Sequence, residues 1–173
     1  MFLLNEACHA KGTHVGFRCI NRGRETAGFC YPNPPPNAQP VDKVVEAMQK
    51  YLDDRKIHHE QGNQEEWYLT VRSLQEQLRT TWERAVEEAV TPVIRRLANR
   101  VDTKGLTKLT AITLDDCNTM RAAFKRCSEL LHSTSEALNT PLPVPVMIQV
   151  EIAILRDWIT SMRERQAKIP TAA

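Results

Sequence analysis

The feature that most constrains the fold is the stretch "YPNPPPNAQP", in which five of the chain's ten prolines fall within nine residues. Proline lacks a backbone N–H, and its ring pushes the preceding residue away from helical geometry, so no helix is expected to cross this stretch. The sequence therefore divides into residues 1–31, a proline-rich linker at residues 32–40, and residues 41–169. The linker prolines are Pro32, Pro34, Pro35, Pro36 and Pro40.

The part before the linker has a mixed pattern. The letters "FLLNEACHAKG" predict a short helix that ends at Gly12. The stretches "HVGFRCINRG" and "ETAGFCYP" predict two short β-strands separated by a turn at Gly23. Two strands alone cannot bury both faces of a sheet. We therefore interpret residues 1–31 either as the end of a larger α/β unit or as an appendage to the helices that follow.

After the linker, apolar residues recur at steps of three and four, which is the period of an amphipathic helix. One apolar stripe runs through residues 41–59 and a longer one through residues 65–90. The first comprises Val41, Val44, Val45, Met48, Leu52 and Ile57. The second comprises Trp67, Val71, Leu74, Leu78, Trp82, Ala85, Val86, Ala89 and Val90.

Pro92 is expected to kink this second helix or to start a new turn, although the letters "VIRRLANRV" after it keep the apolar spacing. A further helix is predicted from Thr113, which with Asp116 has the spacing of a capping box, to about Leu138. The last helix is predicted to start at or near Pro145 and carries Ile148, Ile152, Leu155, Ile159 and Met162 at helical spacing.

Short connections between long amphipathic helices favour an antiparallel bundle. The predicted fold is therefore mainly α: an antiparallel helical bundle preceded by a short helix and two short β-strands. A chain of 173 residues is long enough for such a core, because it buries roughly 70% of its unfolded surface.

Composition narrows the class and the compartment. Hydrophobic residues make up 42% of the chain and charged residues 25%, which is the balance of a soluble globular protein. The five cysteines form an odd set without a C-x-x-C pair, which favours a reducing, cytoplasmic compartment. The apolar runs are too short for a signal-peptide core or a membrane span, so no membrane partner is expected. A net charge of +2 neither requires nor excludes nucleic acid.

A basic cluster follows the second helix and consists of Arg95, Arg96, Arg100, Lys104 and Lys108. Clustered cations of this kind are candidates for contact with nucleic-acid phosphates. The alternative is structural, because cations near a helix C-terminus are stabilised by the helix dipole. The sequence leaves both interpretations open.

The sequence contains no convincing metal or nucleotide site. The residues Cys8, His9, His14, Cys19 and Cys30 do not have the paired spacing of zinc ligands. His58 and His59 lack carboxylate or cysteine partners at ligand spacing. The chain has no G-x-x-x-x-G-K-[ST] loop to hold the phosphates of ATP. No metal and no cofactor is therefore expected in this chain.

The octapeptide "RCSELLHS" places Arg126 and His132 six residues apart. On a straight helix this separates them by about 9 Å along the axis and roughly 120° around it, so they would not touch within one helix. Ser128 and Glu129 lie beside His132 at helical spacing. In the simpler interpretation, Arg126 and His132 flank a core-facing stripe. That stripe comprises Phe124, Cys127, Leu130, Leu131 and Leu138.

The chain resembles the C-terminal end of bacterial ABC/SMC-like AAA ATPases, a group that includes anticodon nucleases and other phage-defence ATPases. Five stretches carry the resemblance. One is "MFLLNEACHAKG" with the two strands after it, and the others are "LRTTWERAVEEAV", "RCSELLHS", "ALNTPLPVP" and "LRDWITSMRER" in the helical part. The resemblance implies that residues 1–31 complete the edge of an ATPase-head sheet and that residues 41–169 are the helical domain under its control. ATP and Mg²⁺ would bind to the parent head and not to this chain.

Anticodon nucleases of this group carry HEPN domains, helical bundles with an R-x4-6-H motif, and Arg126 and His132 match that spacing. The resemblance thus implies metal-independent RNA cleavage, in which histidine moves a proton and arginine stabilises the phosphorane charge at a site assembled across a dimer. The implied partners are a second copy of the chain or an ATPase head, with RNA as a possible substrate.

Three functions follow from these observations. The favoured one is a helical regulatory or interaction domain, with Leu78, Trp82 and Val86 as buried anchors for dimerisation or docking. The second is a HEPN-like ribonuclease that acts through Arg126 and His132. The third is a nucleic-acid-binding tail that uses Arg95, Arg96, Arg100 and Lys104 without chemistry.

Overall fold

The computed structural model describes residues 11–12, 19–21, 29–31, 39–91, 93–95, 100–101, 103–132 and 141–170. The described part is mainly helical, as the sequence predicts. The chain divides into two compact units, residues 1–44 and residues 45–173. No helix in the described ranges has a segment of the length and apolarity needed to cross a membrane.

In the first unit, β1 (Cys19–Asn21) pairs with β2 (Phe29–Tyr31) in an antiparallel register that places Ile20 opposite Cys30. This pairing covers three residues on each side and does not establish the two short strands predicted over residues 14–23 and 25–32. The predicted helix before Gly12 lies outside the described residues. Gly12 itself has a φ of +69°, a conformation that glycine adopts without steric cost.

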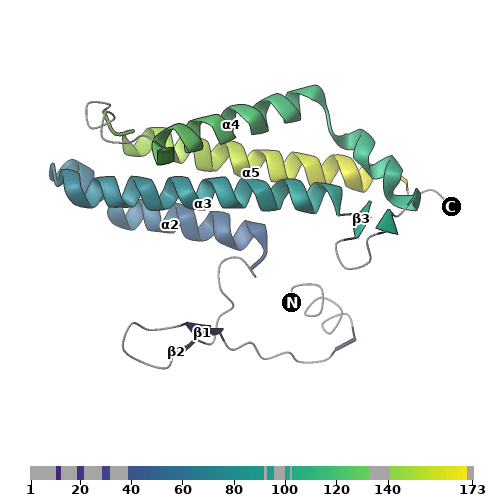
Figure 1. The fold of residues 1–173 in the computed structure, drawn as a ribbon, viewed down its shortest axis with the longest axis horizontal. Coiled ribbons are helices and arrows are strands. Elements are labelled where there is room, and N and C mark those ends of the chain that lie inside the picture. The colour runs from purple at the N-terminus through teal and green to yellow at the C-terminus, as the bar shows by residue number, and fades with distance from the viewer. Residues whose placement is uncertain are drawn as a thin grey trace. The chain divides into compact units, whose positions relative to one another are not determined.

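The second unit contains a helical bundle (Figure 1). Its long helices are α2 (Val41–Glu60, whose first turn belongs to the first unit), α3 (Gln64–Val90), α4 (Leu114–His132) and α5 (Pro145–Lys168). Successive helices run in alternating directions in Figure 1. A hydrogen bond from Trp67 Nε1 to Pro143 O places the starts of α3 and α5 together, and one from Gln166 Nε2 to Ala89 O joins their ends. The described residues of the second unit therefore form the predicted helical bundle, in which α4 runs antiparallel to α3 and α5.

The helix boundaries follow local signals. Asn63 caps α3 by accepting a hydrogen bond from the backbone N–H of Glu66, after a turn in which Gly62 has a φ of +71°. The predicted Thr113–Asp116 capping box is confirmed: Asp116 N donates to Thr113 Oγ1, and Thr113 N donates to Asp116 Oδ2. Pro145 occupies the first turn of α5, as predicted. The predicted end of α4 near Leu138 lies outside the described residues.

The core is built from the predicted apolar stripes. Of the residues predicted to form them, Ile57 is the clear exception, because its side chain is exposed. Trp82 of α3 and Trp158 of α5 meet edge to face with ring centroids 5.4 Å apart. The largest fully buried side chains of the second unit are Met48, Leu52, Trp67, Leu74, Leu78, Trp82, Ile148, Ile152, Leu155 and Met162.

The helical pattern predicted after Pro92 is wrong. The helix α3 ends at Val90, and β3 (Ile94–Arg95) pairs antiparallel with β4 (Arg100–Val101) before the 3-10 helix η2 (Thr103–Ala111). A proline cannot donate the N–H that the next helical turn requires. Ile94 and Val101, which face each other in this ladder, are β-branched residues that favour strands.

Candidate functional site

Arg126 lies on α4 and forms a two-pronged ion pair with Glu151 of α5. Arg126 Nε lies 2.6 Å from Glu151 Oε1, and Nη2 lies 2.9 Å from Oε2. The side chain of Arg126 is 44% exposed, whereas that of Glu151 is 17% exposed. Parallel N–H donors on a carboxylate are the strongest geometry for such a pair. The candidate catalytic arginine therefore links two helices of the bundle.

His132 is the last residue of α4, and its side chain lies outside the described part. Arg126 and His132 belong to one continuous helix, so the predicted offset of about 9 Å along the axis applies to their backbones. The carboxylate of Glu129, which the sequence places beside His132, lies 3.7 Å from Lys125 Nζ. The chemistry assigned to Arg126 and His132 therefore stays a prediction.

Cys127 follows Arg126 and points into the core, with 1% of its surface exposed. Burial, together with the negative charge of Glu151, raises the pKa of the Cys127 thiol to about 11. A thiol in this state is neutral near pH 7 and is a poor nucleophile. The prediction that Cys127 faces the core is confirmed, whereas the side chains of Leu130, Leu131 and Leu138 lie outside the described part.

The basic cluster does not form a single helical face. Arg95 lies directly opposite Arg100 in the β3–β4 ladder, Arg96 is outside the described residues, and Lys104 is exposed on η2. Like charges at facing positions of a ladder disfavour the pairing unless an anion compensates them. The hairpin therefore brings together two of the predicted phosphate-binding residues.

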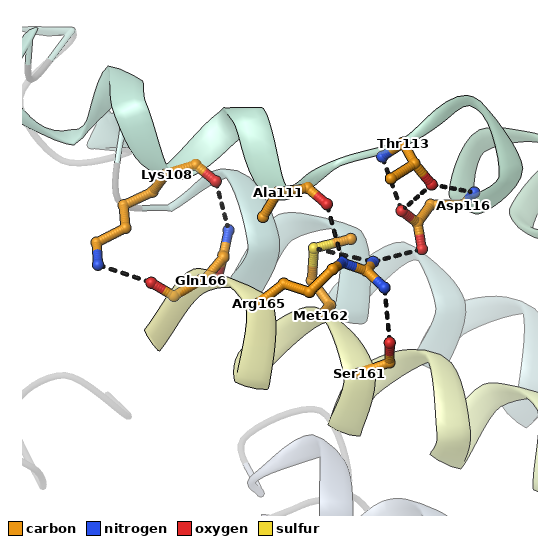
Figure 2. Close-up of polar contacts among 8 residues, drawn as sticks. All are labelled: Lys108, Ala111, Thr113, Asp116, Ser161, Met162, Arg165 and Gln166. Carbon is orange, nitrogen blue, oxygen red and sulfur yellow. Dashed lines mark hydrogen bonds and ion pairs between the residues drawn. The ribbon is translucent and has the colours of Figure 1, made fainter. Parts of the chain in front are cut away.

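Lys108, the fifth member of the cluster, has a structural contact. Its ammonium group donates a 2.7 Å hydrogen bond to Gln166 O near the C-terminal end of α5 (Figure 2). It donates a second hydrogen bond to Ile169 O, directly after that helix. The carbonyl groups at a helix end have no partner within the helix, and the helix dipole makes them favourable for a cation. The structural alternative placed these cations at the end of α3, whereas the carbonyl groups that Lys108 contacts belong to the end of α5.

Arg165 is the residue at this end of the bundle that the sequence did not indicate. Its guanidinium donates to Asp116 Oδ1, Ala111 O and Ser161 Oγ at distances of 2.7, 3.0 and 2.6 Å (Figure 2). Burial alone would raise the pKa of Asp116, but hydrogen bonds from Thr113 and from Arg165 hold it below its ordinary value. The capping box identified Asp116, but nothing local identified its partner 49 residues away.

The remaining polar candidates have structural surroundings. His59 packs edge to face on Trp67, with ring centroids 5.3 Å apart. Within the described ranges, no three His, Cys, Asp or Glu side chains are grouped so that they could hold a metal ion. Of the three residues that the sequence suggests as docking anchors, Leu78 and Trp82 are fully buried inside the bundle itself, whereas Val86 is half-buried. Comparison of the chain with protein-family models, with curated proteins and with solved structures found no match.

Proposed function

We propose that residues 41–169 are a helical interaction and regulatory domain that performs no chemistry of its own. The observation that carries the proposal is the ion pair between Arg126 and Glu151. A guanidinium that already donates twice to a carboxylate has its charge compensated and its orientation fixed by α5. Stabilising a phosphorane requires the opposite arrangement, in which the charge is directed at the substrate.

The proposal includes a parent protein, a cytoplasmic ABC/SMC-like AAA ATPase that acts in phage defence. The domain is the C-terminal tail of this ATPase, and ATP and Mg²⁺ bind to the ATPase head of the parent protein. Residues 1–31 then complete the edge of the head's nucleotide-binding sheet, which gives the β1–β2 pair the neighbouring strands that it needs. The sequence stretches that resemble this group support the proposal.

The test is cleavage of total bacterial RNA by the purified chain in the presence of EDTA. Wild type, Arg126→Ala, His132→Ala and Glu151→Gln are compared, and circular dichroism establishes that each variant is folded. We expect no discrete RNA products from any of the four proteins. Discrete products that both Arg126→Ala and His132→Ala abolish would replace the interaction domain by a HEPN-like ribonuclease. More of these RNA products from Glu151→Gln than from wild type would identify Glu151 as an inhibitor of the ribonuclease.

A second candidate function is contact with nucleic acid through the β3–β4 hairpin. The observation that favours it is the facing register of Arg95 and Arg100. Binding through phosphates releases counterions, so the logarithm of the affinity for a short RNA should fall linearly with the logarithm of the salt concentration. For a single-stranded RNA, the double variant Arg95→Ala, Arg100→Ala should reduce that slope by about 1.4, because two phosphate contacts are lost. Binding that is absent or insensitive to salt would remove this candidate.

A further inference from the structure

The first two turns of α5 are apolar on the side that faces away from the bundle. Val146, Met147 and Val150 are 60%, 58% and 52% exposed, although Ile148 and Ile152 on the opposite side are fully buried. Further along the same helix the outward positions are polar and exposed, as at Arg156 and Thr160. Gln149 is the exposed polar residue of this segment, so the exposed apolar side chains form a stripe along one side of the helix. Exposed apolar patches on a helix are candidates for contact with another protein surface. Among the described residues of the second unit, none covers these three side chains.

The neighbours of α5 define where the open side lies. Glu151 points toward α4, where it meets Arg126, and Arg163 meets Glu88 of α3 across 2.7 Å. The outward stripe between these two directions consists of Val146, Val150, Ala153 and Asp157. Their steps of four, three and four residues are those of a helix seam that packs against a second helix. Ala153 is small, which allows a second backbone to approach closely.

The two ends of this stripe have opposite electrostatic character: the positive end of the α5 dipole lies at one end and the carboxylate of Asp157 at the other. In the described residues α2, α3 and α4 each have an acidic residue in the first turn, whereas α5 has none and its N-cap residue, Val144, makes no side-chain hydrogen bond. The positive end of the α5 dipole therefore has no anion supplied by its own first turn or N-cap. Asp157 is exposed at the other end of the stripe and forms no ion pair with any described residue.

We propose that this stripe is a docking surface for a second copy of the chain, with the two α5 helices packed antiparallel about a two-fold axis near Val150. Asp157 lies about 10.5 Å along the helix from Val150, and Val144 lies about 9 Å from it in the other direction. An antiparallel pair therefore places Asp157 of each copy over the uncapped N-terminus of α5 in its partner. A two-fold axis makes the same contact twice.

This inference rests on the proposed interaction function and names its partner. The stripe is small beside the 20 or so residues a side of a standard interface, so the dimer dissociates on dilution. The measurement is sedimentation velocity of the full chain over a concentration series. Wild type is expected to pass from monomer to dimer. Val150→Glu places two negative charges beside the axis and is expected to leave the chain monomeric throughout.

Two further variants test the arrangement. Asp157→Asn is expected to raise the dimer dissociation constant about tenfold and to weaken its salt dependence, because two charge–dipole contacts are lost. Asp157→Glu should keep most of the affinity. Leu114→Glu is the matched control: Leu114 is a 77% exposed apolar residue at the start of α4, and this variant should dimerise like wild type.

A wild-type chain that stays monomeric at every concentration overturns the proposal, as does a dimer that persists in Val150→Glu. These outcomes leave the interaction function standing, because a different protein would then cover the stripe. RNA cleavage by the chain has the converse effect: it removes the interaction function and leaves the sedimentation result unchanged.

Discussion

Arg165 of α5 donates a hydrogen bond from Nη2 to Oδ1 of Asp116 in the first turn of α4, across 2.7 Å. Asp116 is buried, so Arg165→Met leaves a carboxylate without its cation in an environment that disfavours an unpaired charge. We expect this change to lower the free energy of unfolding at pH 7 by about 2 kcal/mol. Urea denaturation measures it, and Arg156→Met, which removes an exposed cation on the same helix, is the control and should change stability little.

The same pair predicts how stability depends on pH. The pKa of Asp116 is lower in the folded chain than in the unfolded chain, so the folded state is stabilised above the unfolded pKa of about 3.9. That contribution is lost as the pH falls through the folded value. Asp116→Asn should therefore flatten the acid part of the curve of unfolding free energy against pH. An acid limb identical to that of wild type would contradict this assignment.

Lys108→Met should loosen the end of α5. The substitution keeps most of the side-chain volume but removes both hydrogen bonds to the terminal carbonyls of Gln166 and Ile169. We expect a loss of about 1 kcal/mol in unfolding free energy, which is typical of a partly buried cation at a helix C-terminus. Faster amide hydrogen exchange confined to the last turn of α5 is the local readout. Lys125→Met, in which only an exposed ion pair with Glu129 is lost, is the matched control.

Three buried tryptophans differ in whether their indole N–H has an acceptor. Trp67 Nε1 donates to Pro143 O across 3.1 Å, whereas Trp82 and Trp158 have none among the described residues. Trp67→Phe and Trp82→Phe remove the same volume from two fully buried positions. Because only the first breaks a hydrogen bond, we expect Trp67→Phe to be the more destabilising by about 1 kcal/mol in urea titrations. An equal loss from both would show that packing decides the effect.

Local signals made much of this fold predictable. The Thr113–Asp116 box and Pro145 act within one turn of the chain, so the starts of α4 and α5 could be identified from the sequence. The hairpin after α3 could not, because apolar residues at Val93, Ile94 and Leu97 fit a helix and the competing strand pairing depends on residues beyond the turn. Spacing alone therefore did not distinguish the two structures.

The contacts of the candidate site depend on distant residues. Glu151 reaches Arg126 across 25 positions of sequence, and Lys108 reaches Gln166 across 58. Such partners depend on which helices become neighbours and on how those helices are aligned along their axes. A single stripe of apolar residues carries no information on either. The "RCSELLHS" motif therefore did not indicate that its arginine would be paired with Glu151.

The two described cysteines of α4 should differ in reactivity. Cys127 is buried and burial raises its pKa to about 11, whereas Cys117 is partly exposed. At pH 8 the Cys127 thiol stays protonated and inaccessible, so alkylation of the folded chain should modify Cys117 faster than Cys127. Peptide mass spectrometry after a timed pulse of iodoacetamide measures both rates. Comparable rates in the folded chain would mean that α4 opens readily, and urea should remove the difference.

The ion pair between Arg126 and Glu151 should stabilise the bundle, with or without any role in RNA chemistry. Glu151 is the less exposed partner, so Arg126→Ala should cost more stability than Glu151→Gln, which leaves a half-exposed arginine able to reach water. A double-mutant cycle with Arg126→Ala and Glu151→Ala should give a coupling energy of about 1 kcal/mol at low salt, because the contact is bidentate but partly solvated. The coupling should shrink in high salt. Additive effects of the two substitutions would show that the pair does not hold α4 to α5, and the main support for a non-catalytic Arg126 would then be lost.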